Sequence, residues 1–308
     1  MSHPVADLTL VQPAPLVLRG RVFDAGHPAV MAIVNRTDDS FFAGNRHADL
    51  DSAMRALDQA VDEGADIVDV GAESGVTYTP ASAAEVEIER VVPLVERIVA
   101  ELDVVVSVDT YKPAVAEAAI AAGATMVNDV SGLRDPALAA VCARGGAALV
   151  LVHTRAAPKV KLLDPAWDGR VVADAQAFLV ELMALAEAQG VPRECLVLDP
   201  GPDLGKTPAQ TVEVLRALSS FAALGRPLLL AVSRKDFVGV ITGRRPADRL
   251  SGTLAAVAHG LDAGAHILRV HDVAAVADFL AVRTVLRGEA ALPPGVRLAE
   301  DLRRERAR

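Results

Sequence analysis

The sequence predicts an α/β fold, a TIM (β/α)8 barrel, from two observations. First, eight short apolar runs are each followed by a polar residue, a turn and an amphipathic segment. Eight parallel strands joined in this way can close into a barrel whose site lies at the carboxyl ends of the strands. Second, 52% of the residues are hydrophobic but only 3% are aromatic, which suits buried parallel strands covered by helices.

The strands are predicted from runs of Val, Leu, Ile and Ala that are too short for helices. They are residues 30–34, 67–70, 104–108, 125–127, 147–152, 196–198, 228–232 and 267–270. Before them, residues 16–23 alternate in polarity and predict a hairpin that plugs the lower end of the barrel.

The helices are predicted from apolar residues repeating at helical spacing. They are residues 50–63, 113–122, 136–144, 172–189, 209–221, 247–263 and 273–286, with a further helix that follows Ser82. In that further helix, Ser82 and Glu85 have the spacing of a capping box, in which each side chain accepts a backbone hydrogen bond.

The chain divides into three predicted parts. Residues 1–16 form a flexible arm, residues 17–290 a single barrel domain, and residues 291–308 a charged tail. Within the domain, residues 36–46 are long for a strand-to-helix connection and contain Phe41 and Phe42. This segment predicts a lid over a substrate, with an ordinary surface loop as the alternative.

Charge and cysteine content exclude several classes of protein. A net charge of −9 argues against nonspecific nucleic-acid binding, which needs an excess of Lys and Arg. No apolar run reaches the roughly 18 residues that span a bilayer. Cys142 and Cys195 lack CxxC spacing, and we interpret both as buried thiols in a reducing compartment. We therefore expect a cytoplasmic protein with no membrane partner.

Polar side chains that follow the strands are expected to meet at one rim of the barrel. They are Asn35, Asp109, Asn128, His153, Asp199, Lys235, Arg269 and His271. Each alone has the alternative reading of a helix cap or turn former. Together the carboxylates and amides suit a flat heterocycle, and the cationic side chains suit an anion such as diphosphate. Asn35 is a neutral oxygen ligand of the kind that Mg²⁺ accepts.

Other nucleotide and catalytic motifs are absent. Gly205-Lys206-Thr207 resembles part of a phosphate-binding loop, but only three residues separate Gly201 from Gly205, where that motif needs four. No GxGxxG follows a strand, no His/Cys cluster has zinc-ligand spacing, and no nucleophile elbow is present.

The motifs together resemble those of the dihydropteroate synthase family, over nearly all of residues 17–287. The segments that carry the resemblance are MAIVNRTDDSF (31–41), DVGAES (69–74), SVDT (107–110), NDVSG (128–132), DPGPDLGKT (199–207), SRK (233–235) and RVHDV (269–273). The family is a group of TIM barrels, often dimeric, that joins 6-hydroxymethyl-7,8-dihydropterin diphosphate to p-aminobenzoate and releases pyrophosphate.

The resemblance also implies roles for individual residues. Asp109, Asn128, Asp199 and Lys235 would bind the pterin ring, Arg269 and His271 would assist the diphosphate, Ser233 and Leu204 would lie near p-aminobenzoate, and Asn35 would ligate Mg²⁺. The predicted partners are therefore small molecules and a second copy of the chain.

The chain also departs from the family pattern at several positions. Gly75 and Val76 replace a Thr and an anion-binding Arg, and Leu204 replaces a Phe that packs on p-aminobenzoate. Asp38 stands where a Pro is usual, and Ala231 where a Gly is usual. Two alternatives therefore stay open: a pterin-binding paralogue with little or no synthase activity, and a synthase that uses a different aromatic amine. A pterin methyltransferase is disfavoured, because Lys235, Arg269 and His271 suit a diphosphate leaving group.

Overall fold

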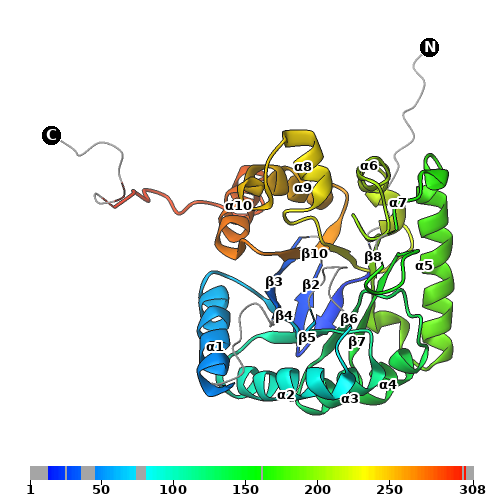
Figure 1. The fold of residues 1–308 in the computed structure, drawn as a ribbon. Helices are drawn as coiled ribbons and strands as arrows, with labels where there is room; N and C mark the ends of the chain where they lie inside the picture. Colours follow the sequence, from blue (N-terminus) through cyan, green and yellow to red (C-terminus); the bar gives the residue numbers. More distant parts are fainter. Residues whose placement is uncertain are drawn as a thin grey trace.

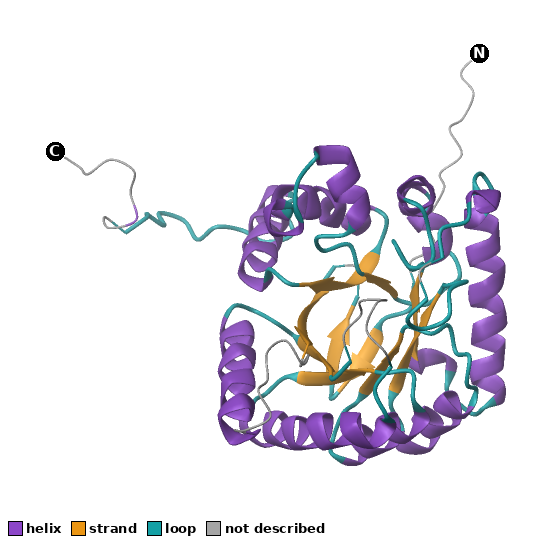
Figure 2. Cartoon of the chain, viewed as in Figure 1, coloured by secondary structure: helices purple, strands orange, loops and turns teal. Residues whose placement is uncertain are grey.

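The computed structural model describes residues 13–24, 26–35, 46–73, 81–160, 162–299 and 302; the side chains of residues 35 and 46–49 lie outside the description. Eight strands form a closed parallel barrel in the order β10-β3-β4-β5-β6-β7-β8-β9. Figures 1 and 2 show the strands as a ring enclosed by helices. The predicted TIM barrel is thus confirmed.

The strands lie within a few residues of their predicted positions. They are β3 (Ala29–Asn35), β4 (Ile67–Gly71), β5 (Val105–Asp109), β6 (Met126–Asp129), β7 (Ala148–Val152), β8 (Leu196–Asp199), β9 (Leu228–Leu230) and β10 (Ala265–Val270). The surrounding α-helices are α1 (Arg46–Asp62), α2 (Ala84–Glu101), α3 (Pro113–Ala121), α4 (Ala137–Gly145), α5 (Val171–Ala188), α6 (Pro208–Arg216), α7 (Leu218–Ala222), α8 (Asp236–Thr242), α9 (Leu250–Asp262) and α10 (Val273–Leu286).

Three local predictions about the helices were wrong. The helix predicted over residues 209–221 is two helices, α6 and α7, and the short α8 was not predicted. The capping box expected at Ser82 does not form, because α2 starts one residue later, with Ala83 at its N-cap. The Ser82 amide instead donates to Glu73 Oε2 at 3.1 Å. A true capping box occurs at α6, between Thr207 and Gln210.

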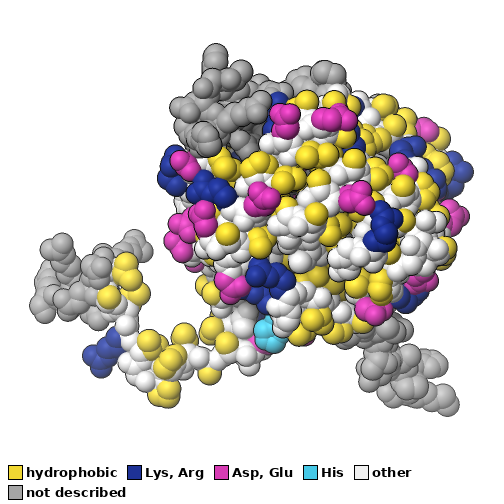
Figure 3. Space-filling view, turned by 90° about the horizontal axis from the view of Figure 1, so that it is seen from below, with side chains coloured by type: hydrophobic (Ala, Val, Ile, Leu, Met, Phe, Trp, Pro, Cys, Tyr) yellow, Lys and Arg dark blue, Asp and Glu magenta, His cyan; other side chains and the backbone are white. Residues whose placement is uncertain are grey.

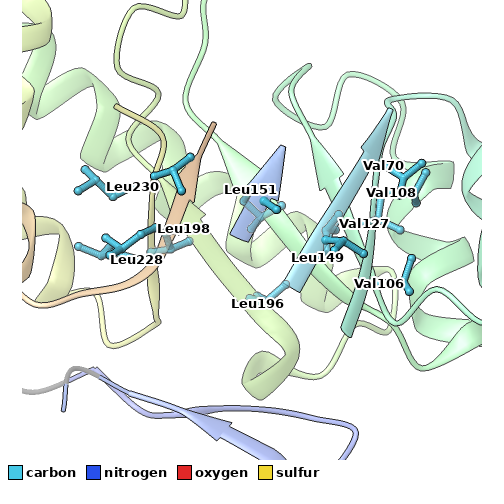
Figure 4. Close-up of a cluster of buried hydrophobic side chains, with 14 of the residues drawn as sticks. Val70, Val106, Val108, Val127, Leu149, Leu151, Leu196, Leu198, Leu228 and Leu230 are labelled. Carbon is cyan, nitrogen blue, oxygen red and sulfur yellow. The ribbon is translucent and has the colours of Figure 1, made fainter. Parts of the chain in front are cut away.

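Alternation along each strand separates two apolar layers. Residues such as Met31, Ile67 and Val105 face the barrel interior. Their neighbours in sequence, such as Val68 and Val106, pack outward against the helices. Figure 4 shows part of the outward set, contributed by neighbouring strands around the barrel wall.

An antiparallel hairpin closes the amino-terminal end of the barrel. It consists of β1 (Leu16–Leu18) and β2 (Arg21–Phe23), in which Leu16 pairs with Phe23. Leu16 and Phe23 are 1% and 5% exposed and pack among the interior barrel residues, whereas Val17, the next residue of β1, points to solvent at 59%. The predicted hairpin plug is therefore present.

Three further features concern the surface, the helices and the cysteines. Positive and negative side chains are interspersed on the face seen in Figure 3. No helix among the described residues is long and apolar enough to cross a membrane. Cys142 is buried and Cys195 is only partly buried, and neither forms a disulfide. The division into an arm, a barrel domain and a charged tail stays a prediction.

Leu16→Ala should lower the free energy of unfolding by about 2–5 kcal/mol, because it removes buried methyl groups from the plugged end. Val17→Ala, in the same strand, should change it by less than about 0.5 kcal/mol, because Val17 is exposed. Urea unfolding followed by circular dichroism measures both. Equal effects of the two changes would contradict the plug.

Candidate active site

Strand alternation also brings the polar side chains together. Asp69, Asp109, Asn128, Asp199 and Arg269 each lie an even number of residues beyond an inward-facing residue of their own strand. They therefore point into the carboxyl end of the barrel, opposite the hairpin. Asp69 is fully buried, and Asn128 and Asp199 are 2% and 3% exposed.

Arg269 links two carboxylates at the centre of this rim. Its Nε donates to Asp69 Oδ2 at 2.7 Å and its Nη2 donates to Asp109 Oδ2 at 2.7 Å. Asn128 Nδ2 donates to the same Asp69 oxygen at 2.9 Å. Asp69 thus fixes side chains from two other strands, and its second oxygen, Oδ1, has no hydrogen-bond partner among the described residues.

The two acidic residues proposed for the ring lie in different surroundings. Burial raises the pKa of Asp109 to about 7, although the Arg269 guanidinium acts in the opposite direction. Burial likewise raises the pKa of Asp199, against the effects of the Gly201 amide and the positive charge of Lys235. Burial therefore disfavours the charged form of both carboxyls, and the neighbouring cations favour it.

The turn after β8 is held by a buried lysine. Lys206 Nζ donates to the carbonyls of Gly201 at 2.8 Å, His153 at 3.0 Å and Leu204 at 3.3 Å. Gly201 has φ +67°, and a Cβ there would lie 2.1 Å from the His153 carbonyl oxygen. Only glycine fits, so the backbone amide of Gly201 can donate to Asp199 Oδ1 at 2.7 Å.

The connection after β9 supplies Ser233 and Lys235. Lys235 Nζ donates to the Pro202 carbonyl at 3.0 Å, and Ser233 Oγ lies 3.0 Å from His271 Nδ1. We expected His271 to offer positive charge. Partial burial and the charge of Arg234 instead lower the pKa of the imidazole well below its usual value, so the ring is neutral at pH 7.

A cavity of about 790 Å³ reaches this rim at Asp109. Asp109 and Lys206 lie in its wall, and so do Leu204 and Asp203 from the turn after β8. Apolar residues of the segment after β7 line another part, among them Val160, Leu162 and Leu163. The cavity thus joins a polar region to an apolar one, as a site for an aromatic substrate requires.

An ion cluster lines the same cavity. Lys112 Nζ donates to Glu73 Oε2 at 2.6 Å and also contacts Glu87, while Lys159 Nζ lies 3.2 Å from Glu73 Oε1. Glu73 and Glu87 are 10% and 3% exposed at their side chains. The cluster joins the loop after β4, the helix α2, the loop after β5 and the segment after β7. It thus holds together the part of the cavity wall that contains Glu73.

Most of the predicted site residues converge, but not all can be placed. His153 Nε2 turns away to Asp174 Oδ2 at 3.0 Å, and Leu204 packs against the interior barrel cluster. The Asn35 side chain lies outside the described residues. So do most of the proposed lid and the second loop, with the substitutions at residues 75 and 76.

Sequence reasoning missed Asp69, Glu87, Lys112 and Lys206. Asp69 lies within the apolar run IVDVG, and a carboxylate in a strand buried on both faces was itself a signal, because such a charge needs partners. Among the described residues, no group of three or more His, Cys, Asp and Glu side chains is placed to hold a metal ion.

A parallel barrel with buried acids, an amide and cations at its carboxyl rim defines an enzyme that binds a polar heterocycle. The family model described as "Pterin binding enzyme" matches residues 31–271. The chain belongs to the dihydropteroate synthase family within this class, since it aligns over most of the length of synthases more than 30% identical to it.

Several relatives carry this assignment. The Escherichia coli dihydropteroate synthase is 37% identical over 84% of this chain and 91% of its own length. The Xanthomonas albilineans dihydropteroate synthase with 4-aminobenzoic acid is 39% identical, with a TM-score of 0.81 over 91% of this chain and 100% of its own. A probable bifunctional folylpolyglutamate synthase/dihydropteroate synthase of Haloferax volcanii is 42% identical over 88% of this chain, which spans only 33% of that protein.

One relative has a different description. The Mycobacterium bovis protein named "Inactive dihydropteroate synthase 2" is 39% identical over 88% of this chain and 86% of its own length. Family membership alone therefore does not fix the level of activity.

Asp69→Ala should lower the free energy of unfolding by about 3–5 kcal/mol, because it leaves the Arg269 guanidinium without one of its buried partners. Urea unfolding at pH 7 measures the loss. Asp103→Ala is the matched control: Asp103 pairs with Arg21, but its side chain is 87% exposed, so little change is expected. A loss below about 1 kcal/mol for Asp69→Ala would refute its structural role.

Stability should rise with pH because of Lys206, whose pKa is lowered to about 7 by burial. The unfolded chain, with an ordinary lysine pKa near 10.4, binds more protons between these two values. The free energy of unfolding should therefore rise by up to about 1.4 kcal/mol per pH unit in that window, relative to Lys206→Met.

Lys112→Met supplies the control for this pH dependence. Glu73 and Glu87 outweigh burial and raise the pKa of Lys112 to about 12, so Lys112 stays charged in the folded and the unfolded chain between pH 7 and 10, and Lys112→Met should keep the rise that Lys206 causes. Chemical denaturation at several pH values compares the three proteins. If the free energy of unfolding of wild type and of Lys206→Met changed in parallel with pH, the lowered pKa of Lys206 would be contradicted.

Proposed function

We propose that this chain is an active dihydropteroate synthase, which joins 6-hydroxymethyl-7,8-dihydropterin diphosphate to p-aminobenzoate and releases pyrophosphate. The observation that carries the proposal is the polar rim, where Asp109 and Asn128 are joined through Arg269 and Asp69 and where the charges of Lys235 and Arg269 act on Asp199. This rim would offer hydrogen-bond acceptors to the amino group and ring N–H of the pterin, and a cation to the carbonyl of the pterin ring. The solved relative with 4-aminobenzoic acid supports the second substrate.

The chemistry needs a carbon–oxygen bond to break and a carbon–nitrogen bond to form. Asp199 and Asn128 would hold the pterin ring edge, and the ring would tolerate positive charge developing on its methylene carbon. The arylamine nitrogen would attack that carbon and then lose a proton, while the diphosphate leaves with the bonding electrons. Arg269 and Lys235 would stabilise that anion with their positive charge, whereas a neutral His271 would donate a hydrogen bond to it.

The proposed magnesium ligand is Asn35, the last residue of β3. A Mg²⁺ ion that takes most of its oxygens from a diphosphate and water needs only one or two protein ligands. When bound, it would neutralise charge on the leaving diphosphate.

The acceptor end of the site supports p-aminobenzoate as substrate but is less aromatic than the family pattern. Ser233 would donate a hydrogen bond to the carboxylate, and Leu204 would offer an aliphatic surface to the ring. This difference keeps another aromatic amine as the second candidate. The inactive relative keeps a pterin-binding paralogue with little synthase activity as the third.

A homodimer and a cytoplasmic location also remain proposals. Val282 and Leu286 of α10 are 60% and 81% exposed, which supports a partner surface on this helix. Two cysteines without a disulfide are consistent with a reducing compartment.

The purified protein with Mg²⁺ should form dihydropteroate and pyrophosphate in equal amounts from the two substrates. Asp199→Ala should lower the affinity for the pterin diphosphate at least about tenfold, because a buried ring N–H loses a charged acceptor. Calorimetry and product analysis measure the two effects. Asp262→Ala, on the surface at the end of α9, is the control and should retain both activities.

The outcomes separate the three candidates. Product that is lost on chelating the metal supports the synthase and its magnesium requirement. Pterin binding without product from several arylamines would favour the paralogue, whereas product from another amine alone would change the acceptor. Unaltered pterin affinity in Asp199→Ala would reject the site assignment itself.

A further inference from the structure

Asp203, in the turn after β8, adopts a conformation that is unfavourable for its residue type. Its φ angle is +59°, in the left-handed region that glycine enters freely and other residues rarely. Aspartate tolerates this region better than most residues, because its short side chain can form local hydrogen bonds. The surroundings must therefore offset the unfavourable backbone.

The Asp203 carboxylate joins two helices from different parts of the barrel. Its Oδ1 accepts from the Thr211 hydroxyl of α6 at 2.9 Å, and the Asp203 amide donates back to Thr211 Oγ1 at 3.0 Å. Its Oδ2 accepts from the backbone amides of Asp236 and Phe237, the latter at 3.3 Å. These two residues are the first of α8.

Asp203 therefore acts as the helix cap that α8 lacks. The N-cap residue of α8 is Lys235, which makes no side-chain cap hydrogen bond. A lysine has no acceptor to offer, and its Nζ instead donates to the Pro202 carbonyl at 3.0 Å. The first amides of the seven-residue α8 find their acceptor on the opposite loop.

Two neighbouring residues of one turn thus hold the start of α8. The Pro202 carbonyl holds the end of the Lys235 side chain, and the Asp203 carboxylate holds the backbone one residue further on. Burial lowers the pKa of Lys235. The charge of Asp203 opposes this effect more than any other neighbouring charge does. Position and charge of Lys235 both depend on this turn.

We propose that Asp203 is a positioning residue for pterin binding, which sets the place of Lys235 by capping α8 from the β8–α6 turn. The inference rests on the proposed function, because Lys235 is there assigned to the pterin. Asp203 itself need not touch the ring, since its effect passes through the first turn of α8.

Three variants test this inference with 6-hydroxymethyl-7,8-dihydropterin diphosphate as the probe in calorimetry. Asp203→Gly removes the cap but relieves the backbone, so that any loss comes from the missing carboxylate; we expect about a tenfold fall in affinity. Asp203→Asn keeps an acceptor oxygen and tolerates the positive φ, and should recover most of that affinity. Thr207→Ala, the control, removes the cap of α6 in the same turn and should stay within about twofold of wild type.

Thermal unfolding confirms that each variant is folded at the temperature of the titration. Loss in Asp203→Gly with recovery in Asp203→Asn supports the inference. Wild-type affinity in Asp203→Gly, or an equal loss in Thr207→Ala, overturns it. If the wild-type protein itself fails to bind the probe, the proposed function fails first, which separates the two hypotheses.

Discussion

The interaction on which the site depends is the pairing of Arg269 with Asp69 and Asp109. Three strands, β4, β5 and β10, meet through these side chains, and Asn128 joins the group from β6 through Asp69. Isolated charges at such depth would be strongly unfavourable, so each one requires the others. This mutual requirement sets the polarity of the barrel mouth.

Around this centre, the turn after β8 coordinates the rest of the rim. Lys206 donates to a carbonyl of this turn, and the Gly201 amide donates to Asp199. Asp203 accepts from the first amide of α8, next to Lys235. A single segment therefore carries one proposed pterin ligand and braces another. The acceptor residue Leu204 lies in the same turn, so the proposed pockets for the two substrates share one support.

The strands, most helices and the converging rim could be predicted, because apolar periodicity and polar residues at strand ends can be recognised within a few neighbouring residues. Asn128 and Asp199 lie at the carboxyl ends of β6 and β8, Lys235 lies in the connection after β9, and barrel geometry brings these ends to one rim. Asp69 was missed because its partners lie 59 and 200 residues away in the chain. The cap of α8 was equally hidden, since the residue that provides it lies 33 residues before Asp236.

The hairpin at the amino-terminal end has a consequence for the order of events. Leu16 and Phe23 fill that end, so substrates and products must enter and leave at the opposite end of the barrel. Asn128 and Asp199 are 2% and 3% exposed, whereas Leu204 is half-buried and lines the cavity. With the substrates bound as proposed, a site that is open at one end requires the pterin to bind before the arylamine and to leave after it. Its kinetics should accordingly be ordered rather than random.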